Sequence, residues 1–384
     1  MIFACQSVLT MGTYALPVVI PVAASDLGVA PESVGFLVAT IYTTAMLVGL
    51  TSGSLLARFG PTRLFQLLLL TVAAGTGVLV LGFVGTAIVS AVLIGVSSGP
   101  MNPTGSLVLS RAAPPDIRAL VFSLKQCGTP VGGMLAGTIL PPLMLAYDWQ
   151  LAVLTIPVLA LALVLFVPAG ELGQREPEKA NADGSIRRTF VALKLIWTDR
   201  PLRAVTLCGF GLAVCQMGLV TYLVVYLWRS VGYSPAQAGL IFAALHVSGI
   251  VSRIVLGLIA DTFLSTRWLL VIVGVALSAV FALIVTLEAS WPLLAVYAVM
   301  ALAGASGNGW VGLYFAELAR LSPCDRIAEV AAGSQFVTYL GIVCGPMLFA
   351  ALLYSFGSYP LCFSVLAVIS LICGIYLAFA GGER

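Results

Sequence analysis

The sequence predicts an all-α membrane protein with twelve transmembrane helices, arranged as two related six-helix bundles. Its 384 residues are 60% hydrophobic and only 9% charged, and the mean hydropathy is +1.10. Soluble domains carry about 25% charged residues, so this composition excludes a water-soluble globular protein. The other two observations behind the prediction are the number of apolar runs and a repeat that relates the two halves of the chain.

Twelve apolar runs are long enough to cross a hydrocarbon layer about 30 Å thick. Glycines, prolines or charged residues separate them. The expected helices cover residues 3–22, 33–56, 64–83, 87–109, 119–143, 150–168, 202–228, 236–260, 267–287, 291–316, 328–353 and 358–380. The long polar stretch 169–200 divides them into two sets of six. We therefore expect an N-terminal bundle over 1–168, a linker over 169–200 and a C-terminal bundle over 201–384.

The two halves match each other at fixed offsets. At a shift of 204 residues the matches are Pro31 with Pro235, Gly35 with Gly239, Gly53 with Gly257 and Arg63 with Arg267. At a shift of 209 residues they are Gly95 with Gly304, Ser97 with Ser306, Arg111 with Arg320, Pro114 with Pro323 and Asp116 with Asp325. Matches held in register over two separate stretches indicate a tandem repeat of two parallel bundles.

Basic residues orient the chain in the membrane. They gather in the connections that follow even-numbered helices and in the linker, whereas only Arg229 lies in a connection on the opposite side. By the positive-inside rule both termini are expected in the cytoplasm, with the helices in the inner or plasma membrane. The net charge of +3 is spread over short loops, so we expect no nucleic-acid partner. The expected partners are the lipid bilayer and a small molecule, and we expect a monomer.

Two segments carry a family resemblance over the whole chain. The segments 53-GSLLARFGPTR-63 and 257-GLIADTFLSTR-267 resemble the Gly-x-x-x-Asp-Arg-x-Gly loop of the major facilitator superfamily. The first has Ala57 where the family has an acid, whereas the second keeps Asp261. The resemblance implies the major facilitator fold and a secondary transporter that works by alternating access, with a cavity between the two bundles.

Arg253 is the main candidate for substrate binding. It lies eight residues before Asp261, about 12 Å inside the expected helix. An arginine at that depth usually faces a polar cavity or a partner. The monocarboxylate and oxalate-type carriers of the superfamily have an arginine in helix 8, followed by glycine four residues later, as in Arg253 and Gly257. The resemblance implies that Arg253 contacts a substrate carboxylate, although Gly249 stands where monocarboxylate carriers often have an acid. A scaffold role is the alternative.

Further polar and aromatic side chains lie well inside the expected helices. Lys125 is about 10 Å deep in helix 5, where it would supply a second positive charge across the interface between the bundles or else extend to the membrane surface. The other expected substrate-binding residues are His246, Tyr14, Asn102, Trp310, Tyr314, Gln126 and Gln335. For each of them, hydrogen bonding between packed helices is the alternative.

Gating and coupling have their own candidates. We expect Asp261 to contact the start of helix 5, from Arg118 to Ser123, when the bundles close on the cytoplasmic side, because an acid is favourable at a helix N-terminus. The other expected gating residues are Arg63 and Arg267. Glu317, within reach of Arg320, and His246 are the candidates for proton coupling.

The sequence is consistent with two functions. The first is transport of a small organic anion, a carboxylate, and the second is proton-driven efflux of hydrophobic compounds or drugs. The second should show an embedded acid in helix 1 or 4, and the sequence has none there. One histidine and eight cysteines without a CxxC pair argue against a metal, a cofactor and an embedded enzyme.

The distribution of basic residues makes a testable prediction about topology. A cysteine introduced at Ser185, within the linker, should be labelled by an impermeant maleimide only after the cell membrane is opened. Labelling of intact cells at this position would contradict the predicted orientation.

Overall fold

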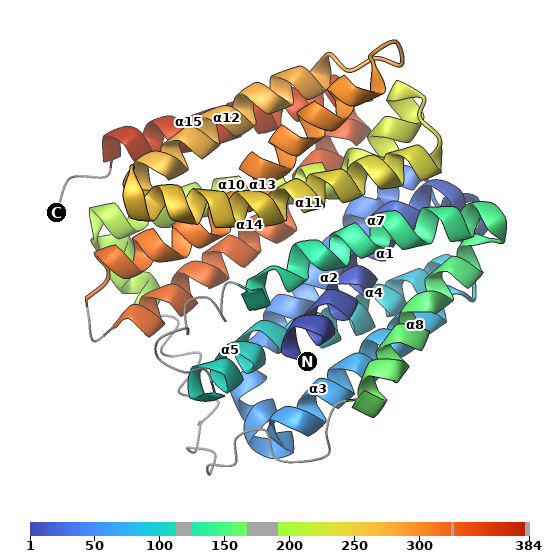
Figure 1. Ribbon diagram of the computed structural model, residues 1–384, viewed down its shortest axis with the longest axis horizontal. Helices are drawn as coiled ribbons and strands as arrows, with labels where there is room; N and C mark the ends of the chain where they lie inside the picture. The colour runs from blue at the N-terminus through green and yellow to red at the C-terminus, as the bar shows by residue number, and fades with distance from the viewer. Residues whose placement is uncertain (113–123, 167–190, 324–325, 381–384) are drawn as a thin grey trace. The chain divides into compact units, whose positions relative to one another are not determined.

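The computed structural model describes residues 1–112, 124–166, 191–323 and 326–380. These residues are almost entirely helical, and the chain separates into two compact units, 1–186 and 187–384 (Figure 1). The boundary between the units falls in 167–190, outside the described residues. The predicted linker limits at 169 and 200 therefore stay a prediction.

The described residues of each unit lie mainly in long helices. In the N-terminal unit these are α1 (Ile2–Leu27), α2 (Val34–Gly49), α3 (Ser52–Leu79), α4 (Val84–Ser98), α5 (Met101–Ala112), α7 (Gly128–Ala146) and α8 (Trp149–Phe166). In the C-terminal unit they are α10 (Arg200–Tyr226), α11 (Pro235–Thr262), α12 (Thr266–Val285), α13 (Leu293–Leu321), α14 (Ile327–Phe356) and α15 (Tyr359–Ala380). In the described part of the chain, eleven helices are long and apolar enough to cross a membrane, and Val84–Ser98 is a shorter apolar helix.

Two of the expected helix limits differ from the structure. The expected helix 87–109 is divided into α4 and α5 at Gly99 and Pro100, since a proline has no N–H to continue the helical hydrogen bonds. The expected break between 56 and 64 is a kink inside α3, at Gly60 and Pro61. Gly60 has φ 72°, a left-handed value that glycine adopts without steric cost. The chain instead interrupts its helix earlier, between α2 and α3.

The same order of helix contacts recurs in both units. In the N-terminal unit α1 packs along α7, α2 along α4, and α3 along α8. In the C-terminal unit α10 packs along α14, α11 along α13, and α12 along α15, as Figure 1 shows for the last pair. These are matching pairs in the two halves, so the six-helix repeat predicted from the sequence is confirmed.

Helices in these pairs approach closely at glycines. A Cβ atom added to Gly132 of α7 would lie 2.5 Å from the carbonyl oxygen of Ser7 in α1. A similar contact occurs in the other unit, where a Cβ on Gly345 of α14 would lie 2.4 Å from the carbonyl oxygen of Val214 in α10. Small residues at helix crossings are typical of membrane proteins, where van der Waals packing replaces the hydrophobic effect between helices.

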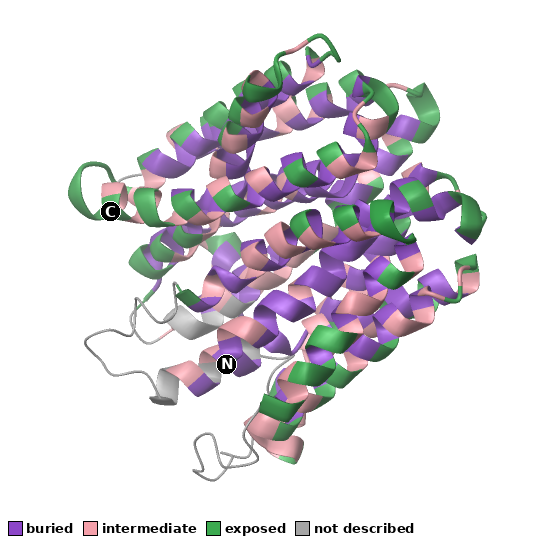
Figure 2. Ribbon diagram, turned by 45° about the vertical axis from the view of Figure 1, so that its right-hand side comes forward, coloured by how far each residue is buried: buried purple, intermediate pink, exposed green. Residues whose placement is uncertain are grey.

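Burial follows the faces of the helices in each unit. Buried and exposed positions alternate along α12 and α15, and many of the exposed ones are apolar (Figure 2). Leu165 of α8 and Phe379 of α15 are among the large apolar side chains left exposed. An outer surface of this kind suits contact with lipid, in which an exposed leucine carries no cost.

The glycine crossings predict how the protein responds to an added methyl group. Gly345→Ala should lower the thermal stability of the detergent-solubilised protein, because overpacking against a backbone oxygen costs about 1–3 kcal/mol. Gly312→Ala in α13 is the matched control, since a Cβ at Gly312 meets no atom within 4 Å. Equal melting temperatures for the two variants would contradict the close approach of α10 and α14.

Candidate functional site

Arg253 of α11 is anchored to the neighbouring helix α13. Its Nε donates a hydrogen bond to the backbone carbonyl of Asn308, at 3.0 Å. Glycines allow this approach. A Cβ on Gly249 would lie 2.8 Å from the Cβ of Asn308, and one on Gly304 would lie 1.9 Å from the carbonyl oxygen of Leu245. Any larger residue at either glycine would push α13 away and so remove Asn308 from the reach of Arg253.

The side chain of Asn308 is held in turn by a partly buried chain of hydrogen bonds. Gln216 of α10 donates from Nε2 to Asn308 Oδ1 at 2.6 Å, and Trp310 donates from its indole nitrogen to Gln216 Oε1 at 3.0 Å. Because both ends of the Gln216 carboxamide are engaged, its orientation is fixed by the network. Three helices, α10, α11 and α13, thus contribute to one polar network around Arg253.

Lys125 lies in a second polar network, in the N-terminal unit. Its Nζ donates to the backbone carbonyl of Asn102 at 3.2 Å, to Asn102 Oδ1 at 2.8 Å and to Ser106 Oγ at 3.2 Å. Lys125 is only 3% exposed. Its aliphatic part passes over Gly105, where an added Cβ would lie 3.1 Å from Lys125 Cε. The lysine therefore folds onto α5 and does not extend to the surface.

Gln6 of α1 completes the second network. Its Nε2 donates to Thr129 Oγ1 of α7 at 2.8 Å and approaches Asn102 Oδ1 at 3.4 Å. The sequence analysis did not include Gln6, Gln216 or Asn308 among the site residues. A signal was present, because Gln6 and Gln216 occupy the first helix of each repeat at a shift of 210 residues.

The remaining candidates from the sequence are distributed over both units. His246 bonds through Nδ1 to the carbonyl of Phe242 at 3.0 Å and packs on the ring of that residue. Tyr314 contacts Ser334 O at 3.3 Å and Thr338 Oγ1 at 3.1 Å, which ties α13 to α14. Trp310 packs edge-on against Tyr314. Tyr14 is buried, and Gln126 and Gln335 are partly exposed. The structure thus joins Trp310 to the Arg253 network and Asn102 to Lys125.

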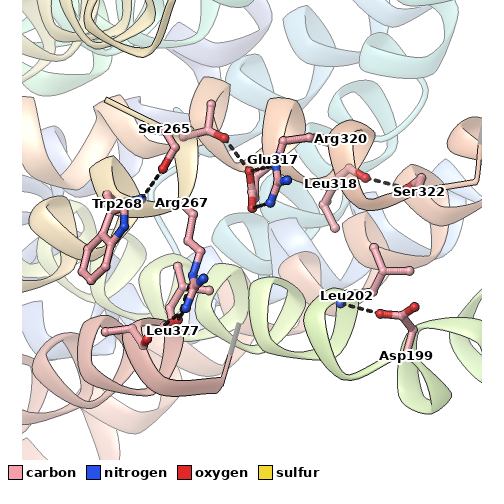
Figure 3. Close-up of polar contacts among 12 residues, drawn as sticks. Asp199, Leu202, Ser265, Arg267, Trp268, Glu317, Leu318, Arg320, Ser322 and Leu377 are labelled. Atoms are coloured by element: carbon pink, nitrogen blue, oxygen red, sulfur yellow. Dashed lines mark hydrogen bonds and ion pairs between the residues drawn. The ribbon is translucent and has the colours of Figure 1, made fainter. Parts of the chain in front are cut away.

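Glu317 is fully buried and serves as a junction between helices (Figure 3). Arg320 binds both of its oxygens, through Nε at 2.9 Å and Nη2 at 2.7 Å. The hydroxyl of Thr266 also donates to Glu317 Oε2. The carboxylate therefore ties α13 to the first residue of α12. These contacts favour a structural role for Glu317, and its role in proton coupling stays a prediction.

The expected gating residues are divided between the two units, and Arg118 lies outside the described chain. Arg267 donates to the carbonyls of Leu377 and Ala378, the latter at 2.9 Å, and so caps the end of α15 (Figure 3). Asp261 and Arg63 are exposed. Arg118 and its neighbours up to 123 lie outside the described residues, so the predicted gate stays a prediction.

The geometry around Glu317 makes a testable prediction. Glu317→Gln should lower the melting temperature, because Arg320 and Thr266 lose a charged acceptor and unsatisfied partners cost about 1–3 kcal/mol.

Glu288→Gln, at an exposed acid, is the matched control and should leave the melting temperature unchanged. The same variants separate structure from coupling. If Glu317 carries a transported proton, Glu317→Gln will abolish the dependence of uptake on pH while the protein stays folded. A fully stable Glu317→Gln protein would contradict the structural role.

Comparisons with known proteins place the chain in a family. The family model described as "Major Facilitator Superfamily" matches residues 2–346. A curated relative is the hexuronate transporter of Bacillus subtilis (strain 168), 25% identical over 149 residues. That alignment covers 38% of this chain and 35% of the relative, so it spans about a third of the relative's length.

Solved transporter structures resemble the chain over nearly its full length. The D-xylose–proton symporter has a TM-score of 0.76 at 15% identity, covering 99% of this chain and 98% of its own. A POT family transporter in complex with 5-aminolevulinic acid has a TM-score of 0.78 at 12% identity, covering 99% and 95%. At these identities the likeness shows the fold alone. Together with the helix contacts that recur in both units, the family match shows that this chain is a multi-pass membrane protein and belongs to the Major Facilitator Superfamily.

Proposed function

We propose that this protein is a secondary transporter that moves a small organic anion, a carboxylate, across the membrane by alternating access. Membership of the superfamily accounts for the transport of a small substrate. The observation that carries the anionic class is Arg253, a guanidinium inside an apolar helix and fixed there by the carbonyl of Asn308. A cation at this depth is costly to insert into a membrane, so its presence indicates a functional role for Arg253.

The geometry of Arg253 suits a carboxylate. The hydrogen bond at Nε restrains the plane of the guanidinium, and a guanidinium can bind a carboxylate through two parallel hydrogen bonds. Gln216 and Trp310 hold Asn308 in place, so the arginine is supported by a network that is already formed. A preformed donor set loses less entropy when the substrate binds.

Lys125 supports the same class of substrate from the other unit. In the described part of the chain, its hydrogen-bond partners are all neutral oxygens, from Asn102 and Ser106. A buried charge held only by neutral groups is stabilised further by a counter-ion, and an anionic substrate would supply one. The hexuronate transporter of Bacillus subtilis adds weaker support, because a hexuronate is a carboxylate.

Uptake into proteoliposomes tests the proposal. The purified protein should accumulate at least one of labelled lactate, oxalate and glucuronate, measured with and without a pH gradient. Arg253→Lys keeps the charge but loses the paired donors, so uptake should fall at least about tenfold. Arg253→Ala should abolish uptake, because truncating a desolvated charge costs about 2–5 kcal/mol.

Arg229→Ala is the control for a lost arginine, since Arg229 is exposed in the π-helical turn Leu227–Val231 that follows α10. It should transport at the parent rate. Lys125→Arg should weaken uptake less than Arg253→Lys. If folded Arg253→Ala protein takes up anions at the parent rate, the anionic class is wrong, and efflux of a hydrophobic dye becomes the assay to run.

A further inference from the structure

The ammonium group of Lys125 is satisfied by the chain itself. An ammonium has three N–H donors, and Lys125 meets three acceptors within 3.2 Å: the carbonyl and side-chain oxygens of Asn102, and the hydroxyl of Ser106. No substrate is needed to complete these contacts. The helix α5 thus carries, one turn apart, the two side chains that replace water around the buried cation.

This matters for the step in which a carrier returns without cargo. A carrier that completes net transport must change conformation while its site is empty, and a buried, unsatisfied cation would oppose that change. A carrier whose cation is satisfied only by the substrate would instead have to move a substrate in both directions. The two cases correspond to net transport and to obligatory exchange.

We propose that Asn102 and Ser106 stand in for the oxygens of the anion when the site is empty, so that the carrier returns unloaded and catalyses net transport. This inference rests on the proposed function, since it presupposes that Lys125 contacts an anion. The anion displaces one or more of the chain's acceptors on binding and restores them on release. Asn102 and Ser106 therefore determine the mode of transport more than the affinity for the substrate.

The C-terminal unit contains a related contact, in which a cation from a different helix of the repeat bonds to the carbonyl of an asparagine. The backbone carbonyl of Asn308 accepts a hydrogen bond from Arg253, and that of Asn102 accepts one from Lys125. Each asparagine also accepts a hydrogen bond at Oδ1 from the Nε2 of a glutamine in the first helix of its unit. The distance is 2.6 Å from Gln216 to Asn308 and 3.4 Å from Gln6 to Asn102. Substitution cannot remove the carbonyl of Asn308, whereas two of the acceptors of Lys125 are side-chain atoms. The N-terminal unit is thus the one to test.

The experiment compares two modes of transport in one preparation of proteoliposomes. Net uptake is measured with labelled glucuronate or lactate outside and no anion inside, and exchange with the same unlabelled anion inside. The parent should show both modes at similar rates. Asn102→Leu/Ser106→Ala removes two of the three acceptors of Lys125, so net uptake should fall about tenfold relative to exchange. The exchange that remains shows that the variant is folded.

Two further variants make the result specific to the charge. Thr129→Val removes a partner of Gln6 but none of the acceptors of Lys125, so the ratio of exchange to net uptake should stay at the parent value. Lys125→Met in the Asn102→Leu/Ser106→Ala background should bring the ratio back toward the parent value, because no cation is left unsatisfied. A double variant whose net uptake and exchange fall equally, or whose ratio is unchanged, overturns the inference.

The outcome for the parent separates this inference from the proposed function. If the parent exchanges the probe anions but shows no net uptake, the inference is wrong while anion transport stands. If the parent moves none of the probe anions in either mode, the proposed function is wrong and the inference falls with it.

Discussion

A positive charge inside an apolar helix must be hydrogen-bonded, and each unit of this membrane protein meets that requirement at an asparagine. Lys125 binds the carbonyl and side chain of Asn102, and Arg253 binds the carbonyl of Asn308. Burying a cation without such partners would cost several kcal/mol. The position of the fourth helix of each repeat, which carries the asparagine, is therefore tied to the position of the cation.

Glycine crossings make these contacts possible. A side chain can reach a carbonyl on the next helix only if the backbones lie close, and α11 and α13 meet at Gly249 and Gly304. In the other unit, Gly105 leaves room for the stem of Lys125, and Gly128 lets α7 approach α1, where an added Cβ would lie 3.0 Å from the Cβ of Gln6. The small residues that pack the helices are thus also the residues that bring polar groups into contact.

Much of the fold follows from the sequence, because apolar length and internal repetition are properties that a single sequence displays. The prominence of Arg253 and Lys125 also follows, since a charge within an apolar run is conspicuous. Their partners do not. Asn308 and Gln216 bond to each other across 92 positions, and only the packing of α10 against α13 brings them together. The partner of Glu317 could not be predicted either, because Thr266 lies on a different helix and no sequence pattern connects the two residues.

The departure of Gly249 from the pattern of monocarboxylate carriers has a physical account in this structure. An acid at that position would stand one turn before Arg253 on the same face of α11, where it would place a carboxylate beside the guanidinium. It would also displace Asn308, whose Cβ lies 2.8 Å from the place of the missing Cβ. With glycine at position 249, the partner of Arg253 is the neutral carbonyl of Asn308 where an acid would have supplied a titratable carboxylate. A neutral carbonyl holds the guanidinium without cancelling its charge at any pH, so the attraction between Arg253 and an anion would not depend on protonation at position 249.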